Sequence, residues 1–225
     1  MSLFADYGGS RVMSARVHLP AWGAPSAVVQ LADDEPILPT ATLTVGDFAA
    51  VMSVERTGPY GGSRGAWLVA GANGWGKSVR RQFYRDTVGG VRLSSVLRDV
   101  AALVGETVLV LPGDDRILGQ YWARSEDVAA MTLARTVGSS WWIDPLGVTQ
   151  LGARPSSVIE VDFDPVDPIR PELGTVTIAT EDILPWTPGA TFSSPLLGDD
   201  IFTISSVSIT MAVGGKMRLE VLTNP

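Results

Sequence analysis

The sequence has no cysteine, one histidine and no long apolar run. The absence of cysteine excludes disulfides, thiolate nucleophiles and cysteine-ligated metal sites. His18 cannot supply the histidine pair of a typical zinc site, and its place in an alternating segment favours a structural role over that of a base. No apolar stretch reaches the roughly 18 residues that cross a bilayer, and the first residues lack the pattern of a signal peptide. We therefore expect a chain made in a cytoplasm and not held in a membrane.

Basic residues are also scarce. The chain has 17 Lys and Arg against 24 Asp and Glu, a net charge of −7, and the basic residues form no run. Proteins that bind nucleic acid concentrate basic residues on one surface. The charge balance therefore argues against a phosphate-binding surface.

What is present describes an ordered globular protein. The 225 residues are 45% hydrophobic and 18% charged, which is enough for one to three small domains. The 24 glycines and 15 prolines favour many short strands joined by turns. The fold class predicted is mainly β, with an α+β insert.

The two ends of the chain have the alternation typical of strands. We expect an N-terminal β-barrel domain over residues 1–90, an insert with two helices and a hairpin over 91–155, and a C-terminal β-barrel domain over 156–225. The strands expected in the first domain are bounded by Gly, Pro and Asp and cover residues 15–19, 27–31, 41–45, 48–54 and 66–70.

The insert has two helical segments. After Ser94 and Ser95, which we expect to cap the first helix, apolar residues follow at helical spacing until Gly105. The second helix is expected to be capped by Ser125 and to end at Gly138. Its first turn holds two acids, and its predicted apolar stripe is Val128, Met131, Ala134 and Val137.

A hairpin that opens on Trp141 and Trp142 follows the second helix. Neighbouring residues of a strand point to opposite faces, so at least one of the two rings is expected to be exposed or at an interface. Together with Trp75 they are the candidate interface residues, because aromatic side chains often anchor protein interfaces.

The two β regions show a possible internal repeat. Gly46-Asp47, an alternating segment, Gly61-Gly62 and a strand recur as Gly198-Asp199, an alternating segment, Gly214-Gly215 and a strand. Such a repeat would give two similar small barrels with the helical insert between them. Any two β-hairpins share strands and a glycine turn, so both interpretations stay open.

One motif suggests nucleotide binding. Residues 71–78 match G-x-x-x-x-G-K-[ST], in which Lys77 and Ser78 would contact phosphate and magnesium. The chemistry needs a helix starting at Lys77, and only a short segment follows before Gly89 and Gly90 break the chain. We expect a glycine-rich hairpin with Trp75 against the barrel, and keep a nucleotide-binding enzyme as the alternative.

Acidic clusters are the remaining candidates for chemistry. Paired acids hydrolyse glycosides only when they face each other across a cleft. The clusters mostly lie in turn-like sequence, so we expect solvated loops and predict no catalytic residue, metal or cofactor. A cation at Asp162/Asp164/Asp167 stays an alternative, although this segment lacks the glycine and terminal glutamate of a calcium loop. The clusters are Asp33–Glu35, Asp114–Asp115, Asp162/Asp164/Asp167 and Asp199–Asp200. A carbohydrate-binding or hydrolytic module stays a further alternative.

Several segments taken in order resemble the baseplate hub family of tailed phages, the late control D type, which is akin to the hub part of type VI secretion spikes. The matching segments are residues 74–76, 84–86, 90–93, 91–106, 117–120, 125–127, 133–134, 141–144, 148–152, 188–190, 204–207 and 215–219. Each motif alone is weak, but together they cover most of the chain.

The resemblance implies a structural protein of the tail tip or baseplate. It implies a homotrimer in which two similar barrels per chain let a threefold ring meet a sixfold tail tube. The partners implied are a tail tube or distal tail protein, a separate spike or tail-fibre hub protein, and a tape measure protein, with DNA only as cargo passing through the lumen. The expected location is the virion, after assembly in the bacterial host cytoplasm.

Overall fold

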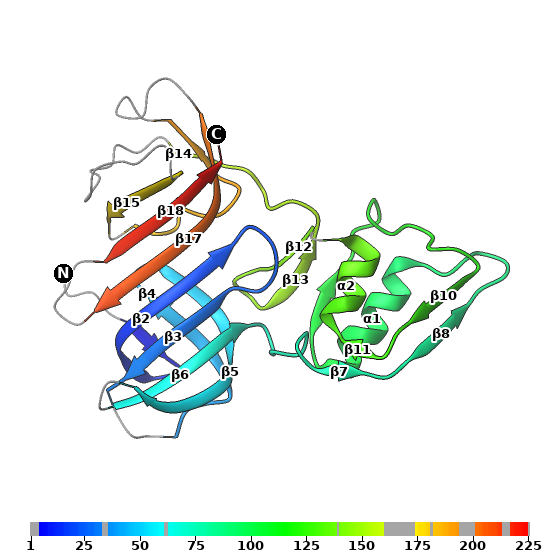
Figure 1. Cartoon of the computed structure of the whole chain (residues 1–225), viewed down its shortest axis with the longest axis horizontal. Helices are drawn as coiled ribbons and strands as arrows, with labels where there is room; N and C mark the ends of the chain where they lie inside the picture. Colours follow the sequence, from blue (N-terminus) through cyan, green and yellow to red (C-terminus); the bar gives the residue numbers. More distant parts are fainter. Residues whose placement is uncertain are drawn as a thin grey trace.

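The computed structural model describes residues 5–32, 36–60, 63–138, 140–159, 174–180, 182–193, 201–212 and 217–224. Within these residues the protein is mainly β, with two short helices, as the fold class predicted. The molecule is elongated: the β modules lie at one end and the insert with both helices projects from them (Figure 1). Neither helix of the described chain is long and apolar enough to cross a membrane.

The N-terminal module is a closed barrel. Strand β1 pairs with both β2 and β4, which closes the antiparallel order β1-β4-β5-β6-β3-β2 into a ring. Alternate side chains fill its interior, and Val17, Val29, Leu43 and Met52 are fully buried. The strands, which include all five predicted from the sequence, are β1 (Ala5–Tyr7), β2 (Ser10–Pro20), β3 (Ser26–Leu31), β4 (Thr40–Val45), β5 (Phe48–Tyr60) and β6 (Ser63–Ala70).

The C-terminal module is an array of antiparallel strands with one short parallel pair. Strand β17 pairs with β18 and β16, β18 pairs with β15, and β16 pairs in parallel with β14. Among the described residues this array is open, so a second closed barrel stays a prediction. The strands are β14 (Val158–Ile159), β15 (Thr175–Ala179), β16 (Thr191–Phe192), β17 (Phe202–Ala212) and β18 (Arg218–Asn224).

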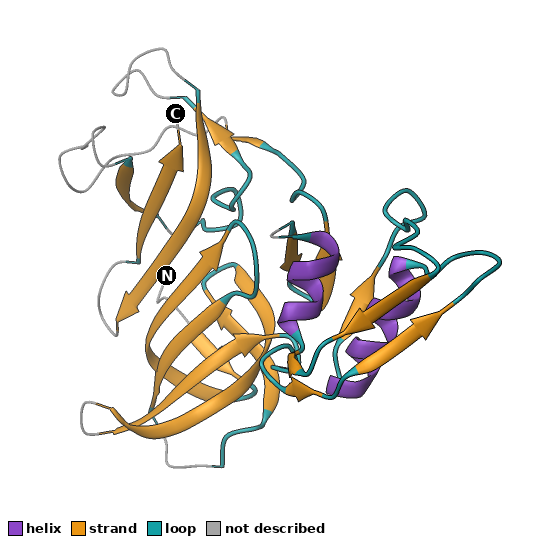
Figure 2. Ribbon diagram, turned by 45° about the vertical axis from the view of Figure 1, so that its right-hand side comes forward, coloured by secondary structure: helices purple, strands orange, loops and turns teal. Residues whose placement is uncertain are grey.

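One continuous sheet joins the two modules. Beyond its pairing with β1, the same edge of β2 pairs over residues 14–20 with residues 206–212 of β17. A second tie comes from the β4–β5 turn, where the Asp47 carboxylate accepts the backbone N–H groups of Ile183 (2.8 Å) and Leu184 (3.2 Å). The two modules therefore form one body, side by side in Figure 2.

The predicted repeat has a partial counterpart in the fold. The long hairpins β5–β6 and β17–β18 each contain one register shift, at Val54/Arg56 and at Ile204/Ser206. The glycine pairs of the repeat lie outside the described residues. The repeat itself stays a prediction.

The insert combines two helices with three small sheets. Strand β7 pairs with β11, β8 pairs with β10, and β12, β13 and β9 form the third sheet. We placed residues 78–85 in the first domain, but strands β7 and β8 pair with strands of the insert. This pairing moves the expected start of the insert toward residue 71. The division into domains stays a prediction. The elements are β7 (Ser78–Val79), β8 (Gln82–Arg85), α1 (Leu93–Val104), β9 (Thr107–Leu109), β10 (Tyr121–Arg124), β11 (Asp127–Val128), α2 (Ala130–Val137), β12 (Trp141–Ile143) and β13 (Val148–Leu151).

Helix α1 is confirmed, but its predicted cap is wrong. The helix ends at Gly105 in the left-handed conformation (φ 81°), as expected. Its N-cap position is Arg92, and Ser94 is already inside the helix. The Ser94 N–H and hydroxyl both donate to the carboxylate of Asp115 at 2.9 Å. An acid from a distant turn therefore caps the helix.

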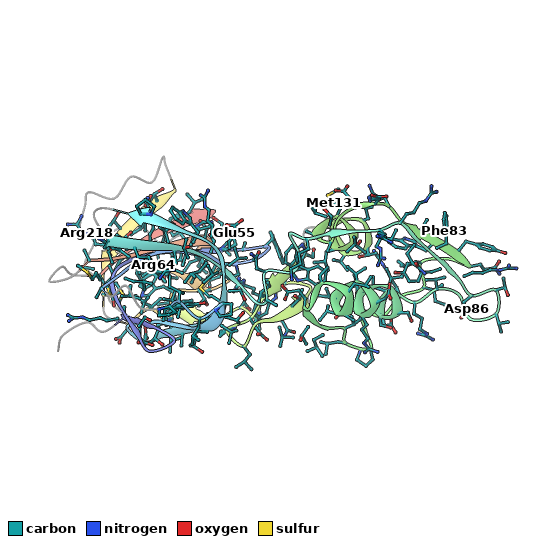
Figure 3. The ribbon with its side chains drawn as sticks, turned by 90° about the horizontal axis from the view of Figure 1, so that it is seen from below. Glu55, Arg64, Phe83, Asp86, Met131 and Arg218 are labelled. Carbon is teal, nitrogen blue, oxygen red and sulfur yellow. The ribbon has the colours of Figure 1, made fainter. Side chains whose placement is uncertain are left out.

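Helix α2 begins later than predicted. Asp127 and Val128 form strand β11 instead of a first helical turn, and the Ser125 hydroxyl accepts a hydrogen bond from Arg135 rather than capping the helix. The predicted stripe is wrong at Val128, Met131 and Ala134, which are exposed, and right at Val137, which packs against the core. Met131 is 37% exposed (Figure 3), and the buried residues of this segment are Ala129, Thr132, Leu133 and Thr136.

Candidate functional site

The three candidate tryptophans gather where the insert meets the barrel. Trp75 is 4% exposed, and its indole N–H donates to the Thr149 hydroxyl at 2.8 Å. The ring of Trp141 lies 6.3 Å from that of Trp75, centroid to centroid. Trp75 thus leaves little surface for a partner, and an interface role for the three residues stays a prediction.

Trp142 faces a half-buried arginine. The guanidinium of Arg154 lies 4.6 Å from the Trp142 ring centroid and donates to the carbonyls of Pro20 (3.1 Å) and Ala21 (3.4 Å). Burial lowers the pKa of Arg154 to about 10, so the side chain stays charged at neutral pH. With the hydrogen bond from Gly23 N–H to the Trp141 carbonyl (2.7 Å), this contact fastens the insert to the β2–β3 turn.

The glycine-rich loop of residues 71–78 is occupied by the protein itself. The Gly74 N–H donates to one carboxylate oxygen of Glu106 at 2.5 Å, and the Ala72 N–H donates to the other at 3.3 Å. Lys77 donates to the carbonyl of Val104, at the end of α1, at 3.0 Å. The segment after Lys77 is strand β7, not a helix. The groups that would cradle a phosphate hold a carboxylate instead.

At two of its glycines this loop leaves no room for added atoms. A methyl group on Gly74 would lie 2.5 Å from the Val104 carbonyl oxygen, and one on Gly71 would lie 2.8 Å from the Glu106 carboxylate. These glycines are required by close packing against the end of α1. Nucleotide binding would require the Glu106 carboxylate to move out of the loop. The close packing does not favour this movement.

Among the described residues, the Asp114–Asp115 pair and His18 form no common site. Within the described residues, Asp115 caps α1, and its pKa is lowered chiefly by the hydrogen bond from the Ser94 N–H. The other three clusters lie wholly outside the described residues. His18 is exposed on β2, 3.4 Å from the hydroxyl of Ser208 across the joint between modules. The described residues hold no cluster of three or more potential metal ligands.

A further cluster holds the two-stranded β8–β10 ribbon against α1. Arg124 is 4% exposed and donates to Asp99 and to the Tyr84 hydroxyl at 3.1 Å each, and to the Arg80 carbonyl at 3.0 Å. The Tyr84 hydroxyl donates to Asp99, and burial raises the pKa of Tyr84. Sequence patterns missed this cluster, as they missed Glu106 and Arg154, because each of these polar groups finds its partners in residues distant in the chain.

No protein-family model and no curated protein matches the sequence. Solved structures do match over nearly its whole length. A tail protein from Neisseria meningitidis MC58 superposes with a TM-score of 0.64 at 13% identity, covering 99% of this chain and 96% of that one. The 43 kDa tail protein of prophage MuSo2 from Shewanella oneidensis gives 0.61 at 11% identity, covering 98% and 97%. The fold is that of phage tail proteins.

A secretion protein shares this tail-protein fold. The E. coli c3393 protein, a component of the type VI secretion system described as similar to the T4 tail proteins gp27 and gp5, gives a TM-score of 0.65 at 10% identity. The match covers 98% of this chain and 76% of that one. The tail-protein fold therefore includes the β modules and the insert together, in agreement with the resemblance stated from sequence.

Proposed function

We propose that this chain is the structural hub protein of a phage or phage-like tail tip or baseplate. In this proposal three copies form a ring that joins the sixfold tail tube to a threefold spike and surrounds the DNA channel. The tail-protein fold over the whole chain is the observation that supports it. The virion tail is then the site of action, after assembly in the host cytoplasm.

The joint between the modules supports the ring. Because β2 and β17 pair directly, each chain presents two β modules at a fixed spacing. Three such chains present six modules, which can meet a hexameric tube even if the two modules are only similar. The interfaces must be heterologous, and they must close.

The acidic charge fits a channel for DNA. A net charge of −7 per chain would repel phosphates, so the genome would pass without binding. The other proposed partners are a tube or distal tail protein on one side, a spike or tail-fibre hub protein on the other, and a tape measure protein in the lumen.

Light scattering coupled to size exclusion tests the proposal. A trimer has a mass of about 71 kDa, three times the 23.8 kDa of one chain. A monomer at every concentration contradicts the ring. An ATP titration tests the enzyme alternative: we expect no saturable binding, and binding that is lost in Lys77→Ala would contradict the structural role.

A further inference from the structure

The two-stranded ribbon of β8 and β10 has a free edge along β8. Among the described strands, β8 pairs with β10 alone. The N–H of Asp86 donates to the carbonyl of Gln120, and hydrogen-bonded pairs alternate along an antiparallel ladder. The backbone N–H and C=O groups of Phe83 and Arg85 therefore point away from β10. In Figures 1 and 2 this side of β8 lies along the outer margin of the insert, where a further strand can approach.

The side chains along this edge are basic and aromatic. Arg81, Phe83 and Arg85 alternate on the outer face of the ribbon, and Phe83 is 66% exposed. The guanidinium of Arg81 lies 4.6 Å from the Phe83 ring centroid, and that of Arg85 lies 5.4 Å from the ring centroid of Tyr121 on β10. The next acid along the chain, Asp86, accepts hydrogen bonds from the N–H groups of its own turn. Two positive charges thus flank one exposed ring.

The edge is presented on a fixed support. The inner face of the ribbon is held on α1 by the hydrogen bonds that join Arg124, Tyr84 and Asp99. A strand that is already ordered loses little conformational entropy when a partner pairs with it. When an extended segment adds to such an edge, its main-chain hydrogen bonds supply affinity, and the alternate side chains of the edge supply specificity.

The charges on β8 select the kind of partner. If a second copy of β8 paired with this edge in antiparallel register about Phe83, Arg81 of each copy would lie opposite Arg85 of the other. Like charges directly opposite each other destabilise a strand pair, so the edge disfavours its own copy. A strand with an acid opposite each arginine and an apolar residue opposite the ring instead forms two opposite-charge pairs and one apolar pair. The complement of this edge is therefore an acidic, extended segment.

We propose that the free edge of β8 binds an extended acidic segment of another tail protein as the third strand of the ribbon. The segment has acid, apolar and acid residues at alternate positions, opposite Arg81, Phe83 and Arg85. That the partner is a tail protein rests on the proposed function, whereas the chemistry of the segment follows from the edge itself. The insert then holds a neighbouring protein at the end of the molecule away from the β modules (Figure 1).

A peptide with the core Glu-Thr-Val-Thr-Glu tests the edge. Its core reads the same in both directions, so it offers the same side chains in parallel or antiparallel register. We expect the peptide to shift backbone NMR signals along β8, above all those of Phe83 and Arg85, and to leave β9 unshifted. Strand β9 is the matched control edge, because among the described strands it pairs with β13 alone and it carries no arginine. Equal shifts on both edges, or none on β8, would overturn the inference.

Charge reversal tests whether the arginines recognise the segment. We expect Arg81→Glu with Arg85→Glu to weaken binding of this peptide by about tenfold or more, and to favour a Lys-Thr-Val-Thr-Lys peptide instead. Arg16→Glu with Arg98→Glu makes the same charge change at exposed positions of β2 and α1 and should bind the acidic peptide as the wild type does. Equal melting temperatures show that the variants fold. Unchanged binding in the β8 variant contradicts the proposed recognition.

A methylated peptide tests whether the segment adds as a strand. Methyl groups on the nitrogens of its Thr, Val and Thr residues remove the main-chain donors that a third strand uses, and we expect binding to be lost. Equally tight binding of this peptide would reduce the contact to side chains and overturn strand addition. A single-stranded oligonucleotide that shifts the same signals at lower concentration than the acidic peptide would assign the edge to nucleic acid instead.

The outcomes separate this inference from the proposed function. If the chain forms a trimer and the acidic peptide does not shift β8, the hub proposal stands and strand addition is wrong. If the chain is a monomer at every concentration and still binds the acidic peptide on β8, the site stands and the hub proposal fails.

Discussion

The backbone N–H of Gly74 donates a 2.5 Å hydrogen bond to the carboxylate of Glu106, which lies 32 positions further along the chain. Glu106 is 7% exposed and also accepts from Ala72. The contact ties the glycine-rich loop to the segment that follows α1, and the carboxylate occupies the place where a phosphate-binding loop holds its ligand.

Gly74 and Gly76 of this motif are expected to differ in how much an alanine substitution destabilises the protein. Gly74→Ala forces a methyl group to 2.5 Å from the Val104 carbonyl oxygen, whereas at Gly76 the nearest atom would be 3.9 Å away. We expect Gly74→Ala to lower the free energy of unfolding by about 1–3 kcal/mol through overpacking, and Gly76→Ala to change it by less than about 0.5 kcal/mol. Thermal denaturation measures both, and equal effects would contradict the packing described.

Removal of the carboxylate should destabilise the same loop. Glu106→Ala leaves the N–H groups of Gly74 and Ala72 without their acceptor, which costs about 1–3 kcal/mol. Glu55→Ala, at an exposed position of β5, is the control and should be nearly neutral. Urea unfolding gives both values. If Glu106→Ala bound ATP with saturation, the loop would be a nucleotide site that its own glutamate blocks.

Asp115 should stabilise α1 in a pH-dependent manner. Its pKa is lower in the folded protein than in the unfolded chain, so its stabilisation is fully present above the unfolded value of about 3.9 and is lost as pH falls through the lower folded value. We expect Asp115→Ala to cost about 1 kcal/mol at pH 7, the usual scale for a lost helix cap, and almost nothing near pH 2. Asp114→Ala removes the neighbouring acid at an exposed position and is the control, which should leave the stability at pH 7 nearly unchanged. Urea midpoints across this pH range measure the difference.

The contact between Arg154 and Trp142 should control how firmly the insert is held. Arg154→Met keeps most of the apolar stem but loses the hydrogen bonds to Pro20 and Ala21 and the charge over the ring. We expect faster hydrogen exchange at Gly23, whose N–H bonds to Trp141, by about fivefold to thirtyfold for a loss of 1–2 kcal/mol. Arg11→Met, at an exposed position of β2, should leave this exchange unchanged.

Sequence patterns predicted what depends on neighbours in the chain. Alternation located the strands of the first barrel, and helical spacing with Gly105 located α1. Patterns failed where a distant residue decides the local structure. Helix α2 starts late because Asp127 and Val128 pair with β7, and α1 is capped by Asp115 rather than by its own serines.

In the candidate site, too, sequence patterns predicted the local structure and missed the contact made by a distant residue. The absence of a helix after Lys77 was predicted correctly, because the sequence pattern holds none. The predicted hairpin is wrong, since β7 pairs with β11 of the insert and not with β6. The ligand of the glycine-rich loop, Glu106, had no sequence signal, since nothing local marks that acid as buried. Closure of the second barrel concerns residues outside the described part of the chain and stays a prediction.

The central claim is that three copies of this chain place six β modules around a channel. Electron micrographs of the purified assembly, averaged in projection along its axis, test it most directly. The account predicts a threefold ring with six lobes of similar size around an open centre. A compact particle without a channel, or single elongated molecules with the outline of Figure 1, would contradict it.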